Sequence, residues 1–250
     1  MPIGSGRKGA VSGTSPRRGA LDFERPLVLV DVVVFAVRDD RLEVLLVRRP
    51  ADSNDPYPGA WALPGGFVDV GRDADLSACA ARKLRDKTGI DPPYLEQVGS
   101  FGGRDRDPRG WSVTTVYFVL LSAQSIVGGL SDDASWAPVD REGVARALAF
   151  DHAVLLAAAV RRLRAKVEYT SLPAFLLPAE FTLSDLQHAY EIVLDRPLEK
   201  SAFRTRILST TLVEPVPKRR EGANRPAQLY RLRDPGELVY FPRTFNPPRD

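Results

Sequence analysis

The chain has 250 residues, of which 44% are hydrophobic and 27% charged, the balance of a soluble globular protein with one large domain or two ordinary ones. Because 35 basic residues nearly cancel 32 acidic ones, the net charge of +3 says little about a polyanionic partner, and the position of the charges matters more. The longest uncharged apolar run has eight residues (153–160) and Cys79 is the single cysteine, which excludes a membrane span, an intramolecular disulfide and a cysteine zinc cluster.

Residues 1–26 are dominated by Gly, Ser, Pro and Arg and show no hydrophobic period. Five basic residues against two acidic ones give this segment a net charge of +3. A segment of this composition buries too little apolar surface to fold, so we predict a disordered basic tail. The tail is either solvated or in contact with a phosphate backbone. The segment also lacks the apolar core of a signal peptide, which favours a cytoplasmic location.

Two buried strands are expected next. Residues 27–37 are β-branched and apolar except for Asp31, and residues 41–49 include a Leu-Leu-Val run; the polar residues 38–40 form the turn between them. A further strand is expected at residues 113–121.

Two helices accompany these strands. Leu76, Ala80 and Leu84 are aligned at helical spacing, and Gly89 ends that pattern. Residues 151–166 form a second helix, rich in Ala and Leu, with a basic C-terminal turn that suits the helix dipole. Strands and helices mixed in this way over residues 27–166 predict an α/β domain.

The charge pattern changes after residue 166. Residues 167–195 carry five acidic residues and no Lys or Arg, whereas residues 196–233 carry ten basic residues against three acidic ones, a net charge of +7. This asymmetry indicates a second domain, residues 167–250, with one side suited to a polyanion.

The order of elements in this second part is that of a winged helix-turn-helix. A helix is expected at residues 181–194, where Thr182 and Asp185 are spaced as a capping box, and another at residues 198–209. Strands at 212–216 and 227–232 enclose a basic loop. The second helix would enter the major groove of double-stranded DNA while the wing meets phosphate or minor groove. The candidate DNA-binding residues are Lys200, Ser201, Arg204, Thr205, Arg206, Lys218, Arg219, Arg220 and Arg225.

In the first domain, residues 65–90 resemble the Nudix box, the signature of hydrolases that cleave nucleoside diphosphates linked to another group. The entry from Gly65 to Val68 and the exit Thr88-Gly89-Ile90 are kept, although the spacing between them is about two residues too long. In that family, glutamates of the box helix collect Mg²⁺, a hard cation that requires oxygen ligands.

This sequence departs from the Nudix box at those acidic positions. Lys83, Asp86 and Lys87 stand where the family has glutamates, so three negative charges become a net +1, and the first glutamate is replaced by Arg72 or Ala74. We interpret the domain as a Nudix fold that has lost its metal chemistry, with Mg²⁺ doubtful and no other cofactor.

Basic and aromatic residues remain that suit a nucleotide effector. Lys83 and Lys87 either contact a diphosphate or are exposed helix residues; Trp61 either stacks a base or packs. The arginines of residues 102–111 suit phosphate recognition by forked donors, or form a solvated turn; this loop resembles one in ADP-ribose-type Nudix proteins. His152 and His188 have no visible catalytic partner, which favours structural roles. The candidate ligand-binding residues are Arg48, Arg49, Trp61, Lys83, Lys87, Arg106 and Arg109.

A degenerate Nudix domain followed by a winged helix resembles the Nudix-related regulators of bacterial NAD metabolism, the NrtR family, and the Lys83–Gly89 variant of the box is similar to its NadQ-like branch. The resemblance implies an N-terminal α/β/α sandwich, a homodimer, repression of NAD-biosynthesis genes and ADP-ribose or a related nucleotide as effector. Ligand binding would act by shifting the spacing of the two recognition helices.

Two other classes stay open. One is a working Nudix hydrolase with metal held by Asp86 and by Asp69, Asp73 or Asp75. The other is a nucleotide-binding adaptor whose winged helix contacts protein rather than DNA.

Overall fold

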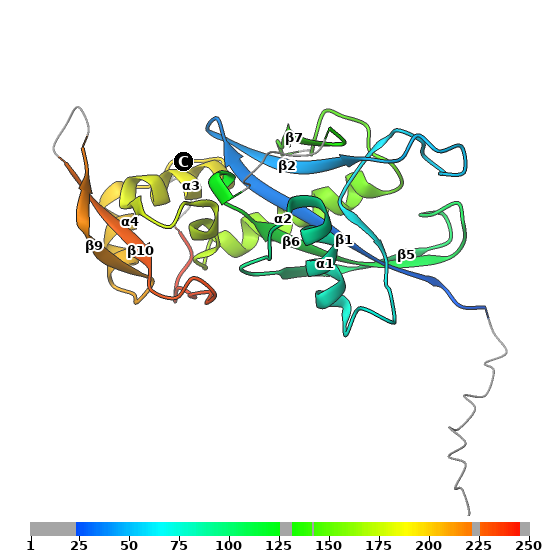
Figure 1. The fold of residues 1–250 in the computed structure, drawn as a ribbon. Coiled ribbons are helices and arrows are strands. Elements are labelled where there is room, and N and C mark those ends of the chain that lie inside the picture. The colour runs from blue at the N-terminus through cyan, green and yellow to red at the C-terminus, as the bar shows by residue number, and fades with distance from the viewer. Residues whose placement is uncertain (1–23, 126–131, 142, 222–225, 246–250) are drawn as a thin grey trace, which may run out of the picture.

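The computed structural model describes residues 24–125, 132–141, 143–221 and 226–245. Most of the predicted tail, residues 1–23, therefore lies outside the described residues. Figure 1 shows a sheet flanked by helices, with a smaller unit of helices and strands packed at one end of it. Within the described ranges, no helix is long and apolar enough to cross a membrane.

A seven-stranded mixed sheet forms the first part. The parallel pair β1–β6 lies at its centre, with Val32 opposite Tyr117, and the remaining pairings are antiparallel. β4 also pairs with β1, and β7 with β2. The main path is β3 (Trp61–Ala62), β2 (Arg41–Arg48), β1 (Leu27–Arg38), β6 (Ser112–Leu120) and β5 (Glu96–Gly103); β4 is Gly65–Phe67, β7 is Ala134–Pro138, and a short 3-10 turn η1 is Ala123–Ser125.

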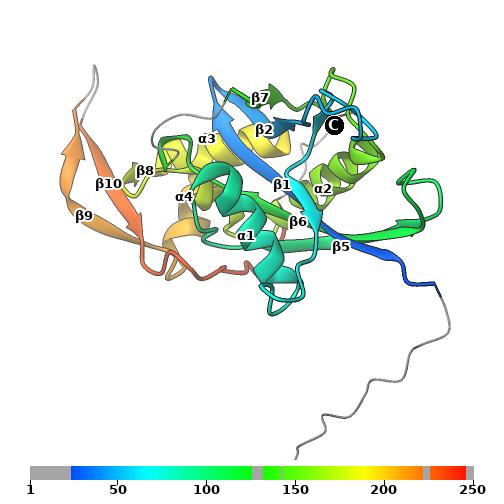
Figure 2. The ribbon, with the colours of Figure 1, turned by 45° about the vertical axis from the view of Figure 1, so that its right-hand side comes forward.

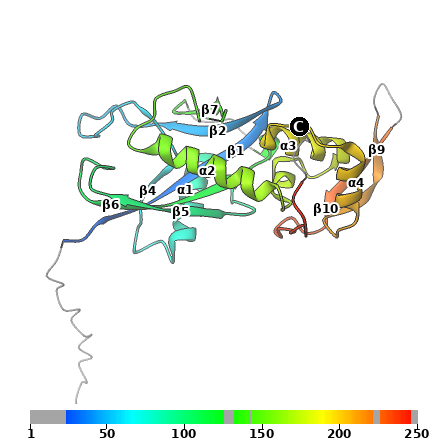
Figure 3. The ribbon, with the colours of Figure 1, turned by 180° about the vertical axis from the view of Figure 1, so that it is seen from behind.

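The central strand β1 is buried on both faces, which explains its uninterrupted apolar sequence. Val32 packs in one cluster with Ala80 and Leu84 of α1 (Leu76–Thr88), and Val33 packs in another with α2 (His152–Val167). Successive side chains of a strand point to opposite faces, so the two helices cover opposite sides of the sheet. Figure 2 shows α1 in front of the sheet, and Figure 3 shows α2 across the back. The predicted α/β/α sandwich is confirmed.

The second part is a winged helix. It contains a capping box at the start of α3, as predicted: Thr182 accepts from the Asp185 backbone N–H, and the Asp185 carboxylate accepts from the Thr182 N–H. Its sheet has the order β8-β10-β9. The elements are η2 (Leu172–Leu176), β8 (Phe181–Thr182), α3 (Leu183–Leu194), α4 (Lys200–Leu208), β9 (Val213–Arg220) and β10 (Ala227–Leu232).

The two parts share one hydrophobic cluster. It runs from the sheet through Leu163 and Val167 of α2 to Tyr190 of α3 and Phe203 of α4, all buried. The winged helix is thus packed directly onto the end of α2 rather than tethered by a linker.

Candidate functional site

A cavity of about 350 Å³ opens between β1, β2, β4, α1 and the start of α2. Its volume lies in the range of small-molecule sites. Six of the seven residues predicted to bind a ligand line it, although they come from three separate parts of the chain. These six are Arg48, Arg49, Lys83, Lys87, Arg106 and Arg109.

The cavity is cationic. Against its six Lys and Arg side chains stand three carboxylates in the wall, Asp31, Asp55 and Asp107, which leaves a formal charge of +3. His152 adds no charge near neutral pH because burial lowers its pKa. Its Nδ1 accepts a hydrogen bond from the Leu63 N–H at 2.9 Å, which places the ring proton on Nε2. Such a cavity suits a ligand with more than one negative charge.

Forked ion pairs hold two of the arginines in place. Arg49 donates to both carboxylate oxygens of Asp55 at 2.8 and 2.5 Å, and Arg109 donates to those of Asp107 at 2.9 and 2.7 Å. The hydrogen bond from Arg49 lowers the pKa of Asp55, which keeps that carboxylate ionised. Two guanidinium planes are therefore oriented before any ligand arrives.

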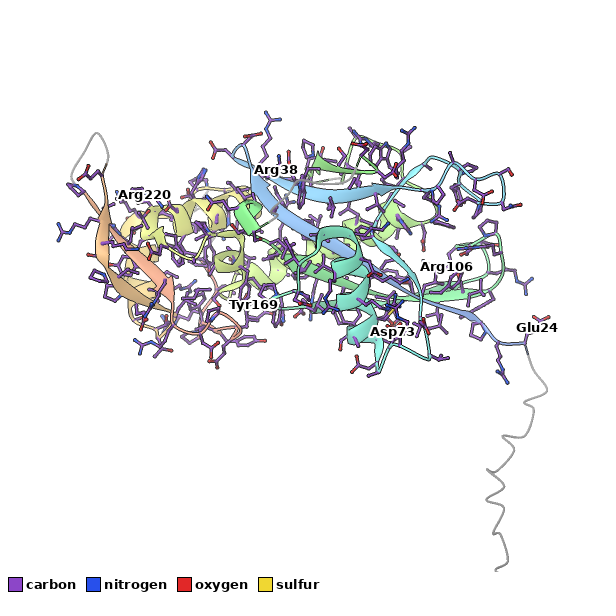
Figure 4. All side chains as sticks on the ribbon, in the orientation of Figure 1. Glu24, Arg38, Asp73, Arg106, Tyr169 and Arg220 are labelled. Atoms are coloured by element: carbon purple, nitrogen blue, oxygen red, sulfur yellow. The ribbon has the colours of Figure 1, made fainter. Side chains whose placement is uncertain are left out.

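Arg106 ties the loop before β6 to the start of α2. It donates to both oxygens of Asp151 at 3.1 and 3.0 Å, and its Nη2 lies 3.8 Å from Asp31. Its side chain is only 8% exposed, and Figure 4 marks it toward the end of the first part that lies away from the smaller unit. The side chain therefore contributes mainly charge and scaffold to the cavity.

An aromatic layer lies between the arginines. Arg109 is over the Phe67 ring at 4.8 Å and the Phe150 ring at 5.7 Å, and Arg49 is over Phe150 at 4.7 Å. Phe150 has a φ of 54°, a strained conformation for a non-glycine residue. Phe67 and Phe150 were not predicted to take part in the site, because isolated aromatic residues carry no periodic signal.

The box helix presents amines to the cavity. Lys83 and Lys87 line it, whereas Asp86 does not, and the Asp86 carboxylate lies 3.7 Å from the Arg82 guanidinium. Of the three positions at which the family has glutamates, Lys83 and Lys87 therefore line the cavity, while the i, i+4 pairing with Arg82 engages the Asp86 carboxylate.

The other carboxylates considered for a metal are engaged elsewhere. Asp73 receives a forked hydrogen bond from Arg82 at 2.6 Å, which holds the pKa of Asp73 well below its usual range. Asp75 caps α1 through the Ala78 N–H, and Asp69 accepts from the Gly71 N–H. Among the described residues, no group of three or more His, Cys, Asp or Glu side chains could hold a metal ion.

Trp61 lies outside the cavity lining. Its ring faces Arg146, whose Cζ is 4.6 Å from the ring centroid, and it packs against the core next to the β2–β3 pairing. Of the two predicted roles, the structure supports packing rather than base stacking.

Gly65 should not tolerate a side chain. A Cβ there would lie 2.2 Å from the Asp31 carboxylate and 2.7 Å from the Val30 carbonyl. We expect Gly65→Ala to lower the free energy of unfolding by about 1–3 kcal/mol, measured by urea denaturation. Gly103→Ala is the control because no heavy atom lies within 4 Å of its Cβ. Equal stability of the two variants would contradict this packing.

Helix α4 presents four of the predicted DNA-binding residues to solvent. Lys200, Ser201, Arg204 and Thr205 are exposed, whereas Phe203 and Ile207 are buried against α3 and the core. The Glu199 carboxylate caps the helix by accepting from the N–H groups of Ser201 and Ala202 at 2.9 and 2.5 Å. No described carboxylate forms an ion pair with Lys200 or Arg204, so both charges are open to a polyanion.

Arg206 was also predicted to contact DNA, but in the structure its guanidinium packs against the residues that follow β10. Its guanidinium turns to the other side of α4, where its Cζ lies 4.0 Å from the Phe245 ring centroid. Nη2 donates to the backbone carbonyls of Arg243 and Thr244. Arg206 and Arg204 are two positions apart on α4, and residues at that spacing in a helix point in different directions.

The wing also differs from the expectation of a basic loop. Lys218, Arg219 and Arg220 belong to strand β9, because pairing with β10 extends as far as Arg220 opposite Ala227. Lys218 pairs with Glu180 at 3.0 Å and Arg220 with Asp185 at 2.8 Å, and Figure 4 marks Arg220 near the outer end of the ribbon. Arg219 is exposed without an ion pair to a described carboxylate. Arg225 lies outside the described residues.

Comparison with known proteins agrees with this architecture. A NUDIX domain model matches residues 28–159, and a model of the NrtR DNA-binding winged helix domain matches residues 173–232. An ADPR-responsive transcriptional repressor of Acinetobacter baylyi is 46% identical over 91% of this chain and 90% of its own length. An ADP-ribose pyrophosphatase of Methanocaldococcus jannaschii is 32% identical over 52% of this chain and 70% of its own.

Among solved structures, Shewanella oneidensis NrtR complexed with a 27mer DNA is 39% identical, with a TM-score of 0.79 over 88% of this chain and 99% of that one. Both halves of the chain, in the same order, are thus matched by one kind of protein. This chain belongs to the NrtR family, in which a Nudix domain is joined to a DNA-binding winged helix.

Proposed function

We propose that this chain is a transcriptional repressor of NAD-biosynthesis genes that acts as a homodimer and whose Nudix domain senses ADP-ribose or a related nucleotide. Support comes from the similar Acinetobacter baylyi protein, named as an ADPR-responsive repressor. The observation that carries the proposal is that one chain holds two separate cationic surfaces, the cavity and the exposed side of α4.

The Nudix domain binds without hydrolysing, and it needs no metal or other cofactor. Hydrolysis in Nudix enzymes depends on carboxylates that hold Mg²⁺. From α1, the cavity wall offers the ammonium groups of Lys83 and Lys87, and Asp86 does not line it. This donor set does not fit Mg²⁺, but it fits the phosphate oxygens that a metal would otherwise neutralise.

Helix α2 links the two surfaces. Asp151 and His152 at its start contact Arg106 and the Leu63 backbone in the cavity wall. Near its end, Arg164 donates to the Val193 carbonyl at the end of α3. A ligand that shifts the cavity wall thus acts on one end of a rigid element whose other end holds the winged helix, which is the coupling that an effector response requires.

The test is fluorescence anisotropy on duplexes from upstream of this gene and of NAD-biosynthesis genes, with and without ADP-ribose, at two salt concentrations. We expect tight, salt-sensitive binding that ADP-ribose weakens, because neutralising several phosphates makes affinity fall steeply with salt. If the DNA is bound tightly and ADP-ribose does not change the affinity, ADP-ribose is not the effector. No preference over random DNA, together with Mg²⁺-dependent cleavage of ADP-ribose, would favour a hydrolase.

A further inference from the structure

The C-terminal arm, residues 238–245, lies beyond the residues matched by the winged helix model, which ends at 232. It runs antiparallel to the segment that follows α2. The Ser171 N–H donates to the Val239 carbonyl at 2.9 Å, and the Phe241 N–H donates to the Tyr169 carbonyl at 2.7 Å. Figure 3 shows this red segment between α2 and α4, and Figure 4 marks Tyr169 at the junction.

The arm ends in the aromatic centre of the helix-turn-helix. Phe245 is 8% exposed, and its ring centroid lies 5.2 Å from that of Tyr190 on α3 and 6.0 Å from that of Phe203 on α4. The Tyr190 hydroxyl donates to the Thr170 carbonyl at 2.7 Å, so the same cluster is anchored to the segment after α2. One side chain thus packs against both helices of the motif.

Arg206 fastens the recognition helix to this arm. Its guanidinium lies over Phe245 at 4.0 Å and over Phe241 at 5.4 Å, and it donates to two consecutive backbone carbonyls, those of Arg243 and Thr244. Both hydrogen bonds come from Nη2, while the guanidinium plane lies over the two rings; a lysine ammonium has no such plane and cannot stack on the rings in the same way.

The other end of the arm reaches the Nudix domain. The Tyr240 ring lies 5.8 Å from Lys166 Nζ, and Lys166 is in a buried ion pair with Glu96 of β5 at 2.6 Å. The Tyr94 hydroxyl donates to the same carboxylate at 2.6 Å. The arm therefore contacts a fixed polar cluster of the first domain and the recognition helix of the second.

We propose that the C-terminal arm is a brace that fixes α4 relative to the Nudix domain, and that Arg206 is a positioning residue for DNA recognition rather than a DNA contact. This rests on the proposed DNA-binding function. In a dimer, both recognition helices must meet half-sites about one DNA turn apart, so a loosened helix loses preference for its site while the charge that attracts any DNA remains.

The experiment compares wild type, Arg206→Ala, Arg206→Lys and Arg204→Ala by anisotropy across a salt series, on the tightest duplex of the upstream DNA and on random duplex. Circular dichroism at each salt checks folding. We expect both Arg206 variants to lose about tenfold in affinity for the specific duplex, with unchanged affinity for random DNA and an unchanged salt slope. Arg204→Ala should instead lower both the preference for the specific duplex and the salt slope, because it removes a charge that meets the DNA directly.

Loss of fold alone would lower the active fraction and weaken specific and random binding equally, so the ratio between them separates positioning from stability. If Arg206→Lys binds as wild type, or if Arg206→Ala reduces the salt slope, Arg206 acts through its charge and the brace is overturned. If the Arg206 variants do not fold, Phe245→Leu decides: specific binding equal to wild type overturns the brace. Failure of the wild type to bind DNA would instead refute the proposed function.

Discussion

The double variant Lys83→Glu/Lys87→Glu should lose at least about 100-fold in affinity for ADP-ribose when no metal is present. Each hydrogen bond to a charged group contributes about 1.5–3 kcal/mol to the binding free energy. Reversing the charge of the two side chains adds repulsion between the new carboxylates and the ligand phosphates. Both side chains line the cavity, and neither forms an ion pair with a described carboxylate that would compensate the change. Isothermal titration calorimetry in EDTA measures the loss.

Adding Mg²⁺ should restore part of the affinity to this variant but not to Lys83→Gln/Lys87→Gln. Two carboxylates one helical turn apart provide the oxygen ligands that a hard cation needs, whereas amides are neutral. Arg85→Glu is the matched control on the same helix, because Arg85 pairs with Asp91 and does not line the cavity. If wild-type binding itself requires Mg²⁺, the metal-independent site is refuted.

The sequence predicted the secondary structure best where the pattern was local. The buried strands, α1, α2 and the capped α3 follow from apolar periodicity and from Thr182 with Asp185, which involve neighbours in the chain. Strand β5 was missed because three of its eight residues are glycine, and β7 because it is short and contains Pro138. Their strand conformation comes from pairing with β6 and β2, which a single sequence does not display.

The net charge of a sequence segment was the least complete guide to the charge of the folded surface. The acidic run 167–195 and the basic run 196–233 look like opposite surfaces, but the fold pairs them: Arg220 with Asp185 and Arg196 with Glu168. Part of the net charge of the basic run is therefore neutralised within the domain. The same holds for Arg206. Its side chain points inward because it contacts the C-terminal arm, and the sequence alone does not show that the arm packs there.

In the cavity, by contrast, six of seven predicted residues meet, because the loop after the second strand and the box helix are fixed by the Nudix pattern. The contacts that orient these side chains could not be predicted, because they join residues far apart in the sequence. Asp31, Arg106 and Asp151 come from three distant segments and converge only in the folded sheet.

Lys200→Ala and Arg204→Ala should each abolish the preference for specific DNA without changing the affinity for ADP-ribose. Both side chains lie on the exposed side of α4, and the cavity is lined by other residues at the opposite end of α2. Loss of a contact to a base edge costs about 1–3 kcal/mol, roughly a 10- to 100-fold change in affinity. Anisotropy on specific and random duplexes, together with calorimetry on ADP-ribose, gives the two quantities separately.

Arg161→Ala is the control for net charge, since Arg161 is an exposed residue of α2 outside the winged helix. It should leave the preference unchanged while removing the same single positive charge. Because Arg204 lies two residues from Arg206, the two substitutions separate direct contact from positioning within one helix: the first lowers the salt slope, and the second lowers only the preference. Unchanged specific binding in both Lys200→Ala and Arg204→Ala would refute α4 as the recognition helix.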